Sequence, residues 1–141
     1  SNMLTSHFLS RIQTAKPLGA AFLPGVKVVF NKQSKDGSGK ANLIEARGFK
    51  TWGVVYEVNS SDFAKLDRIE GGYYQKVVRV VSAKGALVEA VTYISEKLTD
   101  DPRAYPDYKN TILRGTEEYS LPDDYIKYLH SLPVKPWPKT Q

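Results

Sequence analysis

The chain has 141 residues, of which 41% are hydrophobic and 25% charged, and it carries 20 lysines and arginines against 15 acidic residues. This length suits one domain with a buried core, and the composition excludes a disordered chain. No apolar run reaches the roughly 20 residues of a membrane-spanning helix. The absence of cysteine excludes disulfides, thiolate metal sites and a thiol nucleophile. We expect a soluble, cytoplasmic protein without a membrane partner.

The formal net charge of +5 raises the question of nucleic-acid binding. The lysines and arginines are spread along the chain, without a dense basic run, an RNP-like stretch or zinc-finger spacing. We therefore expect a solvated surface with a modest excess of positive charge and no nucleic-acid partner. The alternative, a basic nucleic-acid-binding domain, predicts salt-sensitive affinity for DNA or RNA.

The first half of the chain is dominated by predicted strands. Their β-branched and aromatic content predicts strands over residues 26–30, 43–47 and 52–58, with a loop over residues 31–42. Asn59 to Asp62 then supply candidate N-cap residues for a helix that runs to about Glu70. Gly71 and Gly72 end that helix.

The second half combines a hairpin with two helices. Strands are predicted over residues 74–81 and 87–95, joined by a turn over residues 82–85. The predicted helices cover residues 106–118, interrupted near Gly115, and residues 122–131, with Pro122 as the first helical residue. We expect an α+β domain over residues 1–132 and an extended, proline-rich tail over residues 133–141.

Few catalytic constellations are available in this sequence. His7 and His130 are the only histidines and lack metal-ligand spacing, so we expect no metal and no other cofactor. No strand-turn-helix serine nucleophile motif is present.

Glu70 is the residue that stands out. At 100° per residue it shares an arc of roughly 120° with the apolar side chains Phe63, Leu66 and Ile69 of the predicted helix. Burial and the negative end of the helix dipole both disfavour a carboxylate charge there, which favours general acid/base chemistry near neutral pH. The alternative is a helix-end glutamate that bends into solvent or caps a neighbouring backbone group.

Several motifs occur in an informative order. They are Ser1-Asn2-Met3-Leu4, Trp52-Gly53-Val54-Val55-Tyr56, Leu66-Asp67-Arg68-Ile69-Glu70-Gly71, a tyrosine soon after, Tyr93, Tyr108, and the run from Gly115 to Leu121-Pro122. In this order, from Ser1 to about Leu132, the chain resembles the γ-glutamylcyclotransferase family, with its AIG2-like and BtrG-like relatives. The resemblance implies a small mixed β-barrel with flanking helices and a cavity at one end.

The resemblance also implies a reaction and a set of residues. The family splits γ-glutamyl amides into 5-oxoproline and a free amine without a metal, and Glu70 matches its catalytic glutamate. Ser1, Asn2 and the adjoining Met3 match part of its Y-G-S-N substrate loop. The remaining matches are tyrosines that line the substrate pocket: Tyr74 (or Tyr73, since the register is ambiguous), Tyr93 and Tyr108.

The resemblance leaves several points open. The Tyr-Gly of the loop and the first strand would precede Ser1, so we expect the natural chain to extend further; the alternative is that Ser1-Asn2 is a cloning remnant. The substrate could be a γ-glutamyl amino acid, γ-glutamyl-ε-lysine, glutathione or an acylated biosynthetic intermediate. A homodimer is compatible with the sequence. The alternative function is a catalytically silent AIG2-like module that binds a γ-glutamyl-like ligand or a protein partner.

Overall fold

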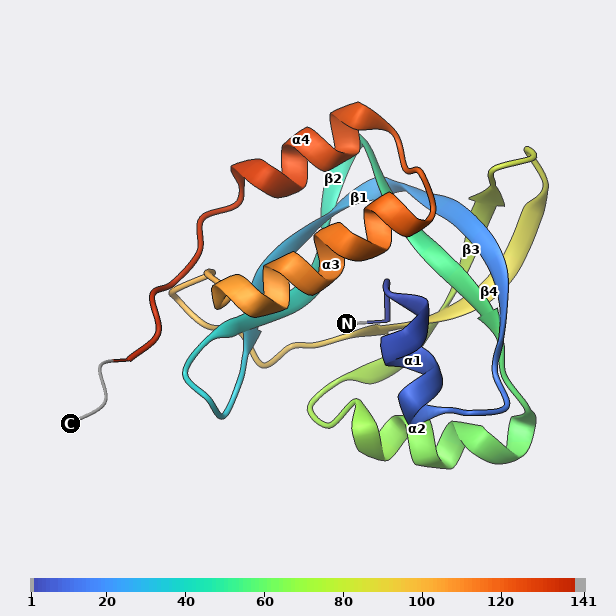
Figure 1. The fold of residues 1–141 in the computed structure, drawn as a ribbon, viewed down its shortest axis with the longest axis horizontal. Coiled ribbons are helices and arrows are strands. Elements are labelled where there is room, and N and C mark those ends of the chain that lie inside the picture. Colours follow the sequence, from blue (N-terminus) through green and yellow to red (C-terminus); the bar gives the residue numbers. More distant parts are fainter. Residues whose placement is uncertain (1, 139–141) are drawn as a thin grey trace.

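The computed structural model of the chain describes residues 2–138, which form an antiparallel sheet flanked by α-helices (Figure 1). None of the helices among these residues is long and apolar enough to cross a membrane. The elements, in chain order, are α1 (Thr5–Arg11), β1 (Lys16–Gln33), β2 (Gly39–Glu57), the 3₁₀ turn η1 (Ser60–Asp62), α2 (Phe63–Ile69), β3 (Tyr74–Ser82), β4 (Leu87–Ile94), α3 (Pro106–Glu118) and α4 (Asp123–Ser131).

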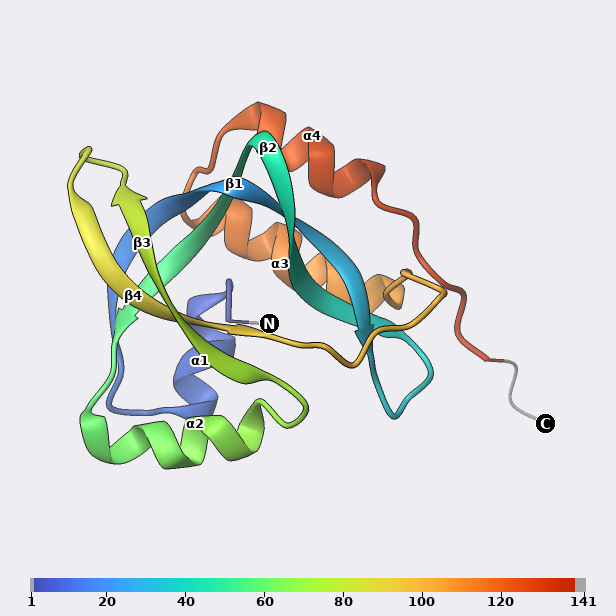
Figure 2. The same ribbon diagram turned by 180° about the vertical axis from the view of Figure 1, so that it is seen from behind.

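The four strands are arranged in the order β2-β1-β3-β4, and every neighbouring pair is antiparallel. β1 and β2 form a long hairpin, while β1 meets β3 only through Ala21 and Phe22. The expected α+β class is confirmed. The expected mixed barrel describes the sheet only loosely, because in residues 2–138 all of its strands are antiparallel and it does not close (Figure 2).

The β1–β2 hairpin is longer than the sequence pattern predicts. Strand pairing extends through most of the predicted loop, and the turn occupies only residues 34–38. The register shifts between Pro17 and Gly19, between Pro24 and Val26, and between Val29 and Lys32. Each such irregularity breaks the alternation of apolar and polar residues, so the sequence shows short strands where the backbone pairing is continuous.

Asp36 closes the turn of this hairpin. Its Oδ1 accepts hydrogen bonds from the Ser38 N–H at 2.9 Å and from the Ser38 hydroxyl at 2.6 Å. These bonds outweigh the effect of burial, which acts in the opposite direction, and they lower the pKa of Asp36 from 3.8 to about 2. The ionised carboxylate therefore stabilises the turn.

We expect Asp36→Asn to flatten the acid dependence of stability. Because the folded-state pKa is depressed, the contribution of Asp36 is complete above about pH 4 and is lost as pH falls toward 2. At neutral pH the free energy of unfolding of the variant should be lower than that of the wild type by about 1 kcal/mol, a figure that allows for solvent screening of a partly exposed group. Urea unfolding between pH 7 and pH 2 measures this, with the exposed Asp100→Asn as control. Parallel curves for wild type and D36N would contradict the assignment.

Two apolar clusters pack against the bent sheet. α3 and α4 cover the β1–β2 hairpin (Figure 1). Phe30, Ile112 and Leu129 are buried in the cluster between the helices and the hairpin. α1 and α2 pack together at the other end, around Phe8 and Leu66. Both clusters contribute side chains to the wall of one cavity that the curved sheet partly encloses.

α1 was not predicted from the sequence. It has seven residues and no side chain that caps its N-terminus, and a helix this short is marginal on its own. Tertiary packing explains its formation: the Phe8 ring stacks on Tyr56 with ring centroids 4.0 Å apart, and Ile12 is only 1% exposed. Packing of this apolar face supplies the stability that the local sequence lacks.

The C-terminal helices differ from the prediction in two details. α3 runs through Gly115 without interruption, so the predicted break is wrong. α4 begins at Asp123, and Pro122 is its N-cap, with φ −57° and ψ 143°, instead of its first helical residue. Beyond α4 the chain is extended: the Lys135 N–H donates to the Ala104 carbonyl at 2.7 Å, and Trp137 stacks on Tyr105.

Candidate functional site

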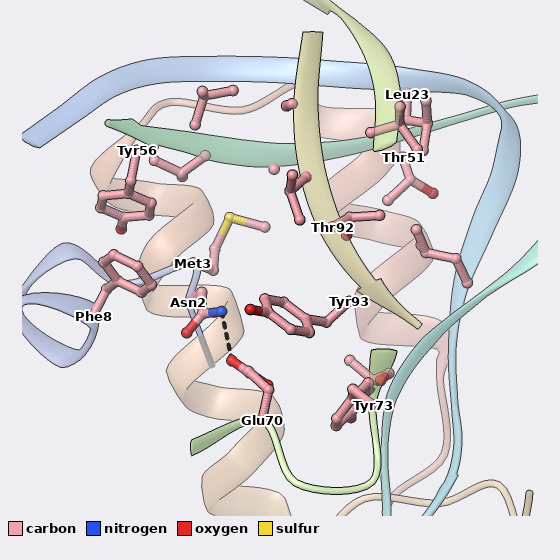
Figure 3. A pocket seen from close by; sticks show the side chains of 18 of the residues that line it. Asn2, Met3, Phe8, Leu23, Thr51, Tyr56, Glu70, Tyr73, Thr92 and Tyr93 are labelled. Carbon is pink, nitrogen blue, oxygen red and sulfur yellow. Dashed lines mark hydrogen bonds between the residues drawn. The ribbon is translucent and has the colours of Figure 1, made fainter. Parts of the chain in front are cut away.

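A cavity of about 730 Å³ lies inside the open sheet. Figure 3 shows Glu70, Asn2 and Tyr93 directed toward one another in this cavity, with Tyr73 nearby. The side chains with polar groups that line it include Asn2, Arg11, Lys32, Lys40, Tyr56, Glu70, Tyr73, Tyr93 and Tyr108. The site therefore combines the Glu70 carboxylate with several cations and tyrosine hydroxyls.

Glu70 is placed by the end of α2 and the turn that follows. Its N–H donates to the Leu66 carbonyl at 2.8 Å, and its own carbonyl accepts the Tyr73 N–H at 3.0 Å. Gly72 has φ +87°, which favours glycine, and its carbonyl accepts the Ser95 hydroxyl at 2.7 Å. The turn is thus attached to the end of β4, and the Glu70 side chain, 14% exposed, lies in the cavity wall.

Asn2 and Arg11 contact the Glu70 carboxylate. The Asn2 amide donates to Oε1 at 2.9 Å, and Arg11 Nη1 lies 3.9 Å from the same oxygen (Figure 3). Arg11 also donates to Oδ1 of Asn2 at 3.5 Å. Of the predicted substrate loop, Asn2 and Met3 line the cavity, while Ser1 lies outside the described residues.

Arg11 is a site residue that the sequence analysis missed. It lies in the last turn of α1, a helix held in place by its buried Phe8. The one available signal was the spacing of Phe8 and Ile12 with a basic residue between them, which is typical of an amphipathic turn but says nothing about a partner 59 positions away, at Glu70.

The two adjacent tyrosines after Glu70 lie in different environments. Tyr73 lines the cavity, its hydroxyl donates to the Ala41 carbonyl at 2.7 Å, and burial raises its pKa above the ordinary value. Tyr74 is 46% exposed and is not among the lining residues. The expectation for Tyr74 is therefore corrected in favour of Tyr73, the residue that remains in the turn before β3 begins.

Tyr93 reaches the cavity from β4 (Figure 3). Its hydroxyl donates to Oδ1 of Asp67 at 2.5 Å, and Gln75 donates to the same oxygen at 2.6 Å. Burial and the bond to Asp67 raise the pKa of Tyr93, while the bonds from Tyr93 and then Gln75 lower the pKa of Asp67. The aspartate of the L-D-x-x-E-G motif thus orients a tyrosine of the cavity.

Tyr108 reaches the cavity from α3 and accepts the Ala41 N–H at 3.1 Å. Burial raises the pKa of its hydroxyl to about 12, so the group is protonated at neutral pH. Tyr73 and Tyr108 therefore bind the carbonyl and the N–H of the same residue, Ala41. Within residues 2–138, no group of three or more His, Asp and Glu side chains is arranged to hold a metal ion.

Comparison with known proteins places this chain in a family. The profile of the AIG2-like family matches residues 50–129. The γ-glutamylcyclotransferase of Bos taurus is 33% identical to this chain, over 94% of the chain and 74% of that protein. The Homo sapiens γ-glutamylcyclotransferase is 30% identical over the same shares.

Solved structures agree with the sequence comparisons. A γ-glutamyl cyclotransferase structure superposes with a TM-score of 0.88 at 26% identity, covering 95% of this chain and 84% of that one. A human protein described as uncharacterized superposes with a TM-score of 0.90 at 26% identity, over 99% and 87% of the two chains. The chain, with its glutamate-centred cavity, therefore belongs to the AIG2-like family and is a relative of the γ-glutamylcyclotransferases.

Proposed function

We propose that the protein cleaves γ-glutamyl amides by intramolecular attack of the substrate α-amine on its γ-carbonyl, which releases 5-oxoproline and a free amine. The observation that carries the proposal is the Glu70 carboxylate, 14% exposed in the cavity wall and bonded by Asn2 at 2.9 Å. The family relationship supports the reaction class, because the relatives named above are γ-glutamylcyclotransferases.

The reaction needs a proton acceptor that later becomes a donor. The α-nitrogen attacks the γ-carbon as Glu70 accepts its proton, and a C–N bond closes the five-membered ring. When the original amide bond breaks, the protonated Glu70 donates to the leaving nitrogen, which departs as a neutral amine. Glu70 thus returns to the carboxylate, and no external nucleophile is consumed.

Besides the proton transfer by Glu70, the cavity orients the substrate. The substrate supplies its own nucleophile, so the protein must fold the glutamyl chain until the amine and the carbonyl are within reach. Backbone N–H groups of the loop around Asn2 are the proposed donors to the oxyanion. Tyr108 is a proposed further donor, because its hydroxyl accepts the Ala41 N–H and thereby keeps its own proton for a bound substrate.

The test is release of 5-oxoproline from a panel of γ-glutamyl amides, measured by mass spectrometry with the full natural chain. The panel contains γ-glutamyl amino acids, γ-glutamyl-ε-lysine and glutathione, and we expect release from at least one of them. A folded protein that releases 5-oxoproline from none would contradict the proposal and favour the silent binding module.

A further inference from the structure

A pair of lysines lines the same cavity as Glu70 without a role in the reaction described above. Lys32 of β1 and Lys40 of β2 are paired directly opposite each other in the hairpin, and both line the cavity. Like charges at directly opposed positions of a sheet destabilise it. Such a pair lowers the stability of the sheet, and a bound anion would offset the repulsion.

Both ammonium groups lie over tyrosine rings of the cavity wall. Lys32 Nζ is 5.0 Å from the ring centroid of Tyr73, and Lys40 Nζ is 4.4 Å from that of Tyr108. Because these tyrosines both bind Ala41, the two cations face the same part of the wall. The Lys32 ammonium group lies against Gly72, because a Cβ built on this glycine would be 3.1 Å from Lys32 Nζ. Gly72 follows Glu70 by two residues in the chain.

Positive charge is in excess at this place. Within residues 2–138, no carboxylate lies within ion-pair distance of Lys32. Lys40 has Asp36 at 3.6 Å, a carboxylate already bonded to Ser38 through its other oxygen. Burial, followed by the charges of Lys97 and Lys40, lowers the pKa of Lys32. A further negative group would relieve this repulsion.

We propose that Lys32 and Lys40 form an anion subsite that binds the carboxylate of an amino-acid leaving group. The inference rests on the proposed function, in which the leaving amine lies next to Glu70. Two ammonium groups provide charge-assisted hydrogen bonds to one carboxylate, and such bonds are stronger than neutral ones. A γ-glutamyl amide of a simple amine lacks this carboxylate and gains nothing from the pair.

The test compares γ-glutamylalanine with γ-glutamylalaninamide, which differ only in whether the leaving group carries a carboxylate or a neutral amide. For the wild type we expect kcat/KM to be at least about tenfold higher for γ-glutamylalanine. Lys32→Met and Lys40→Met should each remove most of this preference by raising KM for the carboxylate substrate alone. Equal kcat/KM values for the two amides in the wild type would overturn the proposal.

Matched controls come from the same two strands. Lys27 of β1 lies 5.4 Å from the Phe49 ring and Lys50 of β2 lies 4.6 Å from the Phe22 ring, and neither lines the cavity. Lys27→Met and Lys50→Met should keep the full preference. An equal loss of activity toward both amides in Lys32→Met and Lys40→Met would also overturn the subsite, because the lysines would then act on the γ-glutamyl half or on folding.

A binding measurement separates this inference from the proposed reaction. Calorimetric titration of Glu70→Gln protein with the same two compounds needs no turnover. Tighter binding of γ-glutamylalanine that disappears on adding Lys32→Met supports the subsite, even if the wild type releases no 5-oxoproline. Equal affinities, or no binding of either compound, would overturn the subsite, even if the wild type does release 5-oxoproline.

Discussion

Glu70→Gln is expected to lower the rate of 5-oxoproline release by about a thousandfold, the midpoint of the range for a general acid/base residue. The amide has the size of the carboxylate and its oxygen can still accept the Asn2 amide, so the wall of the cavity should keep its shape. It can neither accept the proton of the α-amine nor donate one to the leaving nitrogen. The loss should therefore appear in kcat, with KM nearly unchanged.

Glu57→Gln is the matched control, because Glu57 is an exposed glutamate at the end of β2. It should keep wild-type kcat and KM. Circular dichroism and thermal unfolding of both variants separate a chemical effect from a folding effect. If kcat of Glu70→Gln stays within a few-fold of wild type in a folded protein, another group is the proton acceptor and the assignment of Glu70 is wrong.

Gly115→Ala is expected to damage both stability and the site. A Cβ at this position would lie 2.3 Å from Cγ of Met3 and 2.7 Å from its carbonyl carbon and oxygen, so the N-terminal segment would have to move. Overpacking of this kind lowers the free energy of unfolding by about 1–3 kcal/mol. The higher helix propensity of alanine raises it by about 1 kcal/mol. We expect a net destabilisation of about 1 kcal/mol.

The same change should reduce activity, because Asn2 adjoins Met3 and bonds to Glu70. Denaturant unfolding measures the stability, and 5-oxoproline release measures the activity. Glu117→Ala tests whether an exposed position of α3 tolerates alanine, and it should keep both properties. A Gly115→Ala protein more stable than wild type would show that the segment moves at no cost, and the close approach would then be unimportant.

Gly115 also illustrates what local patterns miss. Within a helical stretch, glycine indicates an interruption, and the sequence pattern predicts one at Gly115. α3 nevertheless continues, because the space next to this residue is filled by Met3, more than a hundred positions earlier in the chain. The glycine is required by a tertiary contact and not by the backbone conformation of the helix.

The elements whose signals are local could be predicted from the amino-acid sequence alone. The apolar spacing of Phe63 and Leu66 and the two glycines after Glu70 predicted α2 and its end, and the turn signal over residues 82–85 predicted the β3–β4 hairpin. The order of the motifs also indicated the family. Helix periodicity, caps and turns depend on residues within a few positions of each other, so they are readable along the chain.

Which side chains meet in the cavity depends on the packing of segments that are distant in the sequence. Asn2 and Glu70 are 68 positions apart, α1 forms because Phe8 packs on Tyr56, and Lys32 faces Lys40 because register shifts set the pairing of β1 with β2. The choice of Tyr73 over Tyr74 likewise depends on where the turn ends and β3 begins. Contacts of this kind depend on strand register and packing between distant segments, which no local spacing in a single sequence encodes.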